Sequence, residues 1–221
     1  MMWLAGINAW ALDQKEGVYQ ITSAQDLADF AALVNGGETT ACAALTADID
    51  YTAETARIGT DKNFEGTLDG QGHSVTVNLA SETNGIALIH NNYGTVKDLC
   101  VKGTLATSNK AAGGIVAFNH GVVERCVSLV TIEASVNGDG THGGIAGQSY
   151  DDSRIVDCVF AGRIVGEHTT NCGGIVGWLS GITEIQNCLA IGEVDINVNS
   201  NTSAIARNSG SRGKMKNNYF L

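Results

Sequence analysis

Short apolar segments recur along most of this chain, and polar or glycine-containing breaks separate them. Val, Ile and Thr dominate the segments, which have the length of single strands. Beyond residue 80 no segment repeats its apolar residues at the 3.6-residue interval of a helix. This pattern predicts a series of short β-strands.

One four-residue phrase returns at an almost constant interval. It occurs as GGIV, GGIA and GGIV at residues 113–116, 143–146 and 173–176, with a weaker copy at 84–87 and a degraded one at 203–206. The isoleucines of these phrases are residues 86, 115, 145, 175 and 205, so the spacings are 29, 30, 30 and 30. A period of this size predicts a stacked repeat architecture.

Two further apolar rows keep the same interval. The first row lies 13 residues after each isoleucine, or 11 in one shorter repeat, and the second row lies 19 residues after it, with one member displaced by the same shortening. The first consists of Leu99, Cys126, Cys158, Cys188 and Asn218, and the second of Leu105, Ile132, Ile164 and Val194. Three strands in each coil of about 30 residues predict an all-β fold, a right-handed parallel β-helix. Neighbouring coils are then expected ~4.8 Å apart, with one continuous core inside.

Polar residues and glycines mark the expected corners of each coil. The residues just before the cysteine row are Asp98, Arg125, Asp157, Asn187 and Asn217. Asn and Asp tolerate the left-handed conformation, so this row predicts a bend. The glycine pairs before the isoleucines predict another corner, at which a Cβ atom would clash.

The first 80 residues predict a cap for the open end of the stack. Residues 18–21 form a strand, and a helix is expected to begin at Ser23, with Asp26 at the capping-box position. An apolar stripe over Leu27, Phe30, Ala31 and Val34 follows, and the glycines at 36 and 37 end the helix. Segments 43–50 and 64–73 are expected to form the first coil. We therefore divide one continuous domain into a capping part, residues 1–80, and a repeat part, residues 81–221, and expect it to be a piece of a longer protein.

Composition excludes several functions. The chain has 221 residues, 28 glycines and no proline, which suits paired strands. Its 13 basic and 23 acidic residues give a net charge of −10, which opposes binding to nucleic acids and to anionic membrane surfaces. No segment is long enough to span a bilayer, and residues 1–7 are too short and lack the basic start of a signal peptide.

The six cysteines are predicted to be structural. None is part of a CxxC pair, which argues against a zinc ribbon or a thioredoxin-like site. Cys126, Cys158 and Cys188 are expected to stack inside the coil as free, buried thiols. A disulfide between Cys158 and Cys188 and a metal site are the alternatives.

Acidic residues and histidines offer candidate chemistry that has a simpler structural explanation. A β-helical lyase or glycosidase would need calcium-bound or paired carboxylates near a basic residue. The candidates are Asp48, Asp50, Arg57, Asp61, Asp69 and His73. Turns between strands explain most of them, so we assign no catalytic residue. His142 and His168 could hold zinc, but solvent-exposed loop positions are favoured, and we assign no metal or cofactor.

One row of residues leaves its direction open. It lies three residues after each isoleucine and consists of Ile89, Phe118, Gln148, Trp178 and Asn208. Core packing is favoured, because both faces of this strand are apolar. If the row faces outward, Phe118 and Trp178, with Tyr150 nearby, form an aromatic stripe that contacts a ligand.

The order of these motifs resembles bacterial surface proteins that carry GLUG-type repeats, including secreted adhesin-like proteins and the repeat regions of IgA-protease-type surface enzymes. The motifs that carry the resemblance are YQITSAQDLADFAALVNGG, LTADID, RIGT, FEGTLDGQGHSV and the repeated GGIV phrases, over residues 18–221. Arg207 and Asn218 depart from the small or apolar residues usual in the last repeat. The resemblance implies an extracellular or cell-surface location and a scaffold or binding role, without a catalytic motif to transfer.

The sequence therefore predicts a non-enzymatic surface module that acts as an adhesin, a binding domain or a rigid stalk. Its partner is expected to be a surface glycan or protein of a host or bacterium, and a carbohydrate-active enzyme is the alternative. A further expectation is self-association through an uncapped C-terminal coil.

Overall fold

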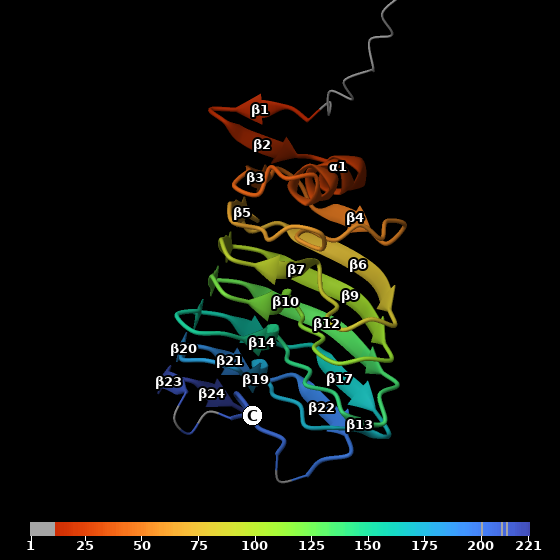
Figure 1. Ribbon diagram of the computed structural model, residues 1–221, viewed down its shortest axis with the longest axis vertical. Helices are drawn as coiled ribbons and strands as arrows, with labels where there is room; N and C mark the ends of the chain where they lie inside the picture. The colour runs from red at the N-terminus through yellow and green to blue at the C-terminus, as the bar shows by residue number, and fades with distance from the viewer. Residues whose placement is uncertain (1–11, 200, 209, 211) are drawn as a thin grey trace, which may run out of the picture.

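Parallel strands stack coil upon coil in the computed structural model, which describes residues 12–199, 201–208, 210 and 212–221 (Figure 1). The strands form three long sheets that run along the stack, and one short helix lies at its N-terminal end. This arrangement confirms the predicted all-β parallel β-helix. The apolar start of the chain, residues 1–7, lies outside the described residues.

The first sheet has nine strands, and all its pairs are parallel except β1 with β2. In spatial order they are β1 (Gln14–Lys15), β2 (Val18–Ile21), β3 (Cys42–Leu45), β5 (Thr67–Asp69), β8 (Thr95–Lys97), β11 (Val122–Glu124), β15 (Arg154–Val156), β20 (Thr183–Gln186) and β23 (Gly213–Lys216).

The second sheet has four strands, which are β7 (Ile89–Asn92), β10 (Val116–Asn119), β14 (Ala146–Ser149) and β19 (Val176–Leu179). The third has nine, which are β4 (Ile49–Tyr51), β6 (Ser74–Ser81), β9 (Cys100–Thr107), β12 (Val127–Ala134), β16 (Val159–Phe160), β21 (Leu189–Ala190) and β24 (Tyr219–Phe220), with β17 (Arg163–Gly166) and β22 (Glu193–Ile196) continuing its far end. A two-stranded ladder joins β13 (Gly138–Asp139) to β18 (Thr169–Thr170).

The strand register confirms three of the four predicted repeat intervals and corrects the first. The backbone N–H of Ile115 donates to Ile145 O at 3.0 Å, and Ile145 and Ile175 repeat this bond one coil further on. In the preceding coil, however, Ile89 pairs with Val116, so Leu88 takes the place of Ile115 and Ile86 does not. The prediction was wrong by two residues because residues 86–89 are all buried and apolar, and backbone pairing alone decides which of them faces Ile115.

The predicted bend row is confirmed in every coil. The φ angles of Asp98, Arg125, Asp157, Asn187 and Asn217 are 52°, 50°, 55°, 53° and 53°. The side chains also join successive coils: Asn187 Nδ2 donates to Asp157 Oδ1 at 2.8 Å, and Asn217 Nδ2 donates to Asn187 Oδ1 at 3.2 Å. These bonds offset part of the strain of the left-handed conformation.

The repeated glycine pairs have a packing cause. A Cβ atom on Gly144 would overlap the ring of Phe160, and one on Gly114 would overlap the Ser128 side chain. Both partners are buried residues of the third sheet, so the glycines allow the second sheet to approach it closely. The predicted clash is confirmed, and neither glycine needs a positive φ.

Helix α1 (Ala24–Asn35) covers the N-terminal end of the stack, as predicted (Figure 1). Ser23 Oγ accepts the Asp26 N–H at 3.2 Å, while the Asp26 carboxylate accepts from Thr22 rather than from the N-cap residue. The helix buries Leu27, Phe30, Ala31 and Val34 in the core, with Leu33 beside them. The expected first coil is in fact two coils, because β3 pairs with β5 and β4 pairs with β6.

The cysteine row lies inside the coil. Cys126, Cys158 and Cys188 are fully buried, and all six cysteines are free, so the disulfide alternative is not adopted. Among the described residues no helix has the length and hydropathy to cross a membrane.

Candidate functional site

The row that the sequence left open faces outward. Phe118 pairs with Gln148, and Gln148 pairs with Trp178, on strands β10, β14 and β19. All three side chains are half-buried, whereas the next residue on each strand is fully buried. Because side chains alternate between the two faces of a strand, Phe118, Gln148 and Trp178 lie on the outer face of the second sheet. The register places Asn91, and not Ile89, before Phe118 in this row.

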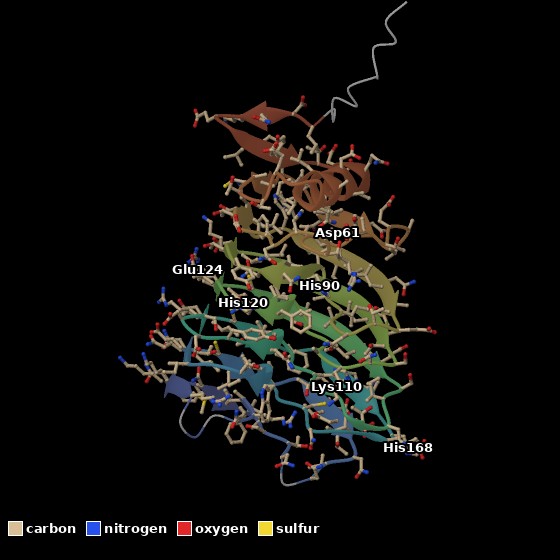
Figure 2. All side chains as sticks on the ribbon, viewed as in Figure 1. Asp61, His90, Lys110, His120, Glu124 and His168 are labelled. Atoms are coloured by element: carbon tan, nitrogen blue, oxygen red, sulfur yellow. The ribbon has the colours of Figure 1, made fainter. Side chains whose placement is uncertain are left out.

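A column of three stacked rings stands beside this row. Tyr93, His120 and Tyr150 follow the last residues of β7, β10 and β14. The ring centres of Tyr93 and His120 lie 4.1 Å apart with 9° between planes, and those of His120 and Tyr150 lie 4.0 Å apart with 10°. Figure 2 shows His120 on this side of the stack. We call these three residues, with Phe118, Gln148 and Trp178, the aromatic face.

Hydrogen bonding connects the column to the row. The Tyr150 hydroxyl donates to Gln148 Oε1 at 2.8 Å, which holds the Tyr150 ring over its own strand. Tyr93 remains 46% exposed, so the column presents ring edges to solvent. The rings are therefore held in one orientation and still accessible.

Arginines border the row at both ends. At one end Phe118 meets His90 edge-on, with ring centres 5.2 Å apart, and Arg57 Nη1 lies 3.4 Å from His90 Nδ1. At the other end the guanidinium carbon of Arg207 lies 4.9 Å from the centre of the Trp178 ring. Both arginines also donate to backbone carbonyls, so they brace the face as structural residues.

The histidines of this region are uncharged at neutral pH. Burial, together with the charge of Arg57, lowers the pKa of His90 below its usual value. Burial alone lowers the pKa of His120. The aromatic face thus has neutral rings and an amide between two arginines. Such a surface suits an uncharged ligand with apolar faces and hydroxyl groups, such as a sugar chain.

The candidate catalytic residues are not brought together into one site. Asp48 Oδ1 accepts the Ser74 N–H at 2.7 Å, and it lies 3.6 Å from His73 Nδ1. Asp50 accepts from Thr52, and Asp69 pairs with Lys97 at 2.8 Å. Each has a local structural bond. Within the described part of the chain, no cluster of three or more His, Cys, Asp or Glu side chains could hold a metal ion.

The proposed loop position of His142 is wrong. This side chain is fully buried, and its Nδ1 accepts the Ala112 N–H at 3.1 Å. Burial lowers the pKa of His142 to about 4, so the ring is neutral. His168 is exposed, as expected, and lies at the far edge of the stack in Figure 2.

Sequence reasoning named Phe118, Tyr150 and Trp178 and missed Tyr93 and His120. A usable signal was present, because Tyr93, His120 and Tyr150 are separated by 27 and 30 residues, close to the repeat interval. The row was followed from Ile86, however, and this placed the first coil two residues out of phase.

Comparisons with known proteins agree on the fold. No family model matches the sequence. A solved structure from Bacteroides ovatus, named "putative immunoglobulin A1 protease", has a TM-score of 0.63 and 20% identity over 92% of this chain and 75% of that one. A segment of 99 residues, 42% of this chain, is 30% identical to halomucin of Haloquadratum walsbyi and spans 1% of halomucin's length.

Proposed function

We propose that this chain is a non-catalytic binding module of a secreted or cell-surface protein and that its aromatic face binds a glycan. The observation that carries the proposal is the outward-facing set of aromatic rings on consecutive coils. The ring column and the Phe118–Gln148–Trp178 row rise side by side across the same coils. A linear ligand can therefore contact several coils at once.

Rigidity supports this function. The residues beneath the row are fully buried in the core, and the strands that present it are paired on both sides in β10 and β14. A preorganised surface loses little conformational entropy when a ligand binds. Adhesion by a stiff rod of this kind needs no moving part.

The two similar proteins give weaker support for the location. One is named as an IgA1 protease and the other as a mucin-like protein, and both names are consistent with a place outside the cell. The net charge of −10 favours neutral over anionic glycans.

A glycan array followed by titration of the best ligand tests the proposal. Tyr150→Ala and Phe118→Ala should each weaken binding about tenfold, since a ring contact contributes on the order of 1 kcal/mol beyond its buried area. Tyr219→Ala is the matched control, because it removes an exposed ring from β24, outside the aromatic face. Equal losses in the control, or no glycan bound by the unaltered protein, would sink the proposal.

A polysaccharide lyase or glycosidase is the competing function. The separate local roles of Asp48, Asp50 and Asp69 argue against it. A panel of polysaccharides incubated with and without calcium should show no cleavage, and reproducible turnover on any of them would replace a binding role with a catalytic one.

Self-association through the last coil stays a separate proposal. Strands β23 and β24 form the outer edges of their sheets, and Met215, Tyr219 and Phe220 are exposed there. Light scattering over a concentration series checks it, and a monomer at millimolar concentration would contradict it.

A further inference from the structure

A groove of about 950 Å³ runs along the third sheet, away from the aromatic face. Its lining consists of three successive positions at the ends of β6, β9, β12, β17 and β22, which are residues 80–82, 106–108, 133–135, 165–167 and 195–197. These strands lie next to one another in Figure 1. The groove therefore crosses the strands and follows the long axis of the stack.

Small residues make the hollow. Ala80 pairs with Ala106, and Ala134 and Gly166 line the neighbouring strands. Val165 and Ile196 add apolar surface at the C-terminal end. The floor can thus accept the aliphatic part of a ligand without any side chain having to move.

Carboxylates border this floor on four of the five strands. Glu82, Glu133, Glu167 and Asp195 all line the groove and are all exposed. No Lys, Arg or His side chain is among the lining residues. None of the four carboxylates forms a salt bridge within the described part of the chain.

A neighbouring pair shows that this is a local property. Glu193 lies two residues before Asp195 on the same strand, and it binds Arg163 at 2.7 Å. Asp69, Asp98 and Glu184 of the first-sheet side are likewise paired with basic residues of adjacent coils. Elsewhere on the stack carboxylates are neutralised from the next coil, while the groove keeps an unbalanced negative charge.

We propose that this groove binds an extended Lys- or Arg-rich peptide segment of a partner protein. Lys and Arg lay their methylene stems on apolar surface and keep the charged group free to pair with a carboxylate. The groove offers both parts in this order, an apolar floor and an acidic border. Five strands span four strand spacings, ~19 Å, which an extended peptide of about six residues covers.

Other occupants fit less well. Nucleic acids and anionic glycans would be repelled by the carboxylates. Glu133 and Asp195 lie in one residue row with Val165 between them, so their Cα atoms are ~9.5 Å apart. That spacing suits successive charged groups on a chain, while a calcium ion needs its oxygen ligands within about 2.6 Å.

Fluorescence polarisation with a labelled peptide of alternating Lys and Ala, six residues long, tests the proposal in low salt. The double variant Glu133→Gln/Glu167→Gln should weaken binding at least about tenfold, because two charge-assisted contacts are lost. Glu38→Gln/Asp61→Asn is the matched control, since it removes the same charge from exposed positions outside the groove. The control should weaken binding less than about twofold, and salt should weaken it in the unaltered protein.

A second variant separates the groove from general charge attraction. Ala134→Trp fills the hollow and leaves every charge in place, so it should abolish peptide binding. Undiminished binding by this variant, or equal losses in the two charge variants, would overturn the proposal. Spermidine that binds as tightly as the peptide would also overturn it, in favour of a small polyamine. Glycan binding by the aromatic face serves as the check that each variant is folded and does not depend on this result.

Discussion

Nη1 of Arg207 lies 3.1 Å from Oδ1 of Asp139, although 68 positions separate the two residues. The same nitrogen donates to Asn171 O at 2.6 Å, and the guanidinium stacks on Trp178. Arg207 looked like a departure from the repeat in the sequence. In the fold it is a buried clamp that holds the last coil to the two coils before it.

Replacing Arg207 should therefore destabilise the C-terminal part of the stack. Arg207→Met keeps the stem but leaves Asp139 and two carbonyl groups without their donor, and we expect a loss of about 2–3 kcal/mol in the free energy of unfolding. Urea denaturation followed by circular dichroism measures it. Arg212→Met, at an exposed position, should cost less than about 1 kcal/mol, and equal effects of the two changes would contradict the clamp.

His142 should make stability depend on pH between about 6.5 and 4. Burial lowers the pKa of His142 from 6.5 to about 4, so the folded ring stays neutral while the unfolded chain takes up a proton. Stability is complete above pH 6.5 and falls as the pH falls toward 4, by about 2–3 kcal/mol between pH 7 and 4.5. His90 and His120, whose pKa values are also lowered, add to this loss with the same sign.

The His142→Asn variant isolates this contribution. Asn cannot titrate, and its side-chain oxygen can still accept the Ala112 N–H. Urea denaturation at pH 7, 5.5 and 4.5 should give a flatter profile for the variant, even if its stability at pH 7 is lower. Parallel profiles for the two proteins would exclude His142 as the titrating group.

The interior thiols should be unreactive in the folded protein. Hydrogen bonding to the Cys126 thiol and burial raise the pKa of Cys158, and burial raises the pKa of Cys172 to about 12. A thiol reagent at pH 8 should modify no more than Cys42 and Cys100, which are partly exposed. In guanidinium chloride all six should react. Fewer than six under those conditions, restored by a reductant, would reveal a disulfide instead.

The bend row should distinguish between substitutions by backbone conformation. Asn187 has a φ of 53°, and a β-branched residue is strained there. Asn187→Val should cost about 1–3 kcal/mol, whereas Asn187→Gly should cost less, because glycine adopts this conformation freely and loses mainly the bond to Asp157. Thermal unfolding of the two variants tests this order, and a glycine variant as unstable as the valine variant would contradict it.

Much of the fold could be predicted because it depends on periodic and local information. The glycine pairs, the Asn and Asp bends and the Ser23 cap each act within one coil or one turn, and all three were confirmed. The candidate site was predicted less well. Phe118 and Trp178 could be named, but their outward direction could not, since Val116 and Ala117 make both faces of β10 apolar.

The sequence by itself determined the coil interval, the three strands of each coil and the positions of their corners, because strand propensity, turn chemistry and glycine packing repeat with the chain. Only the tertiary structure decided that Leu88 faces Ile115, that His142 is buried, and that Tyr93, His120 and Tyr150 share one column. These relationships join residues about one coil apart, and a shift of one or two positions, which the apolar pattern tolerates, changes every neighbour. Backbone pairing and close packing between coils remove that freedom.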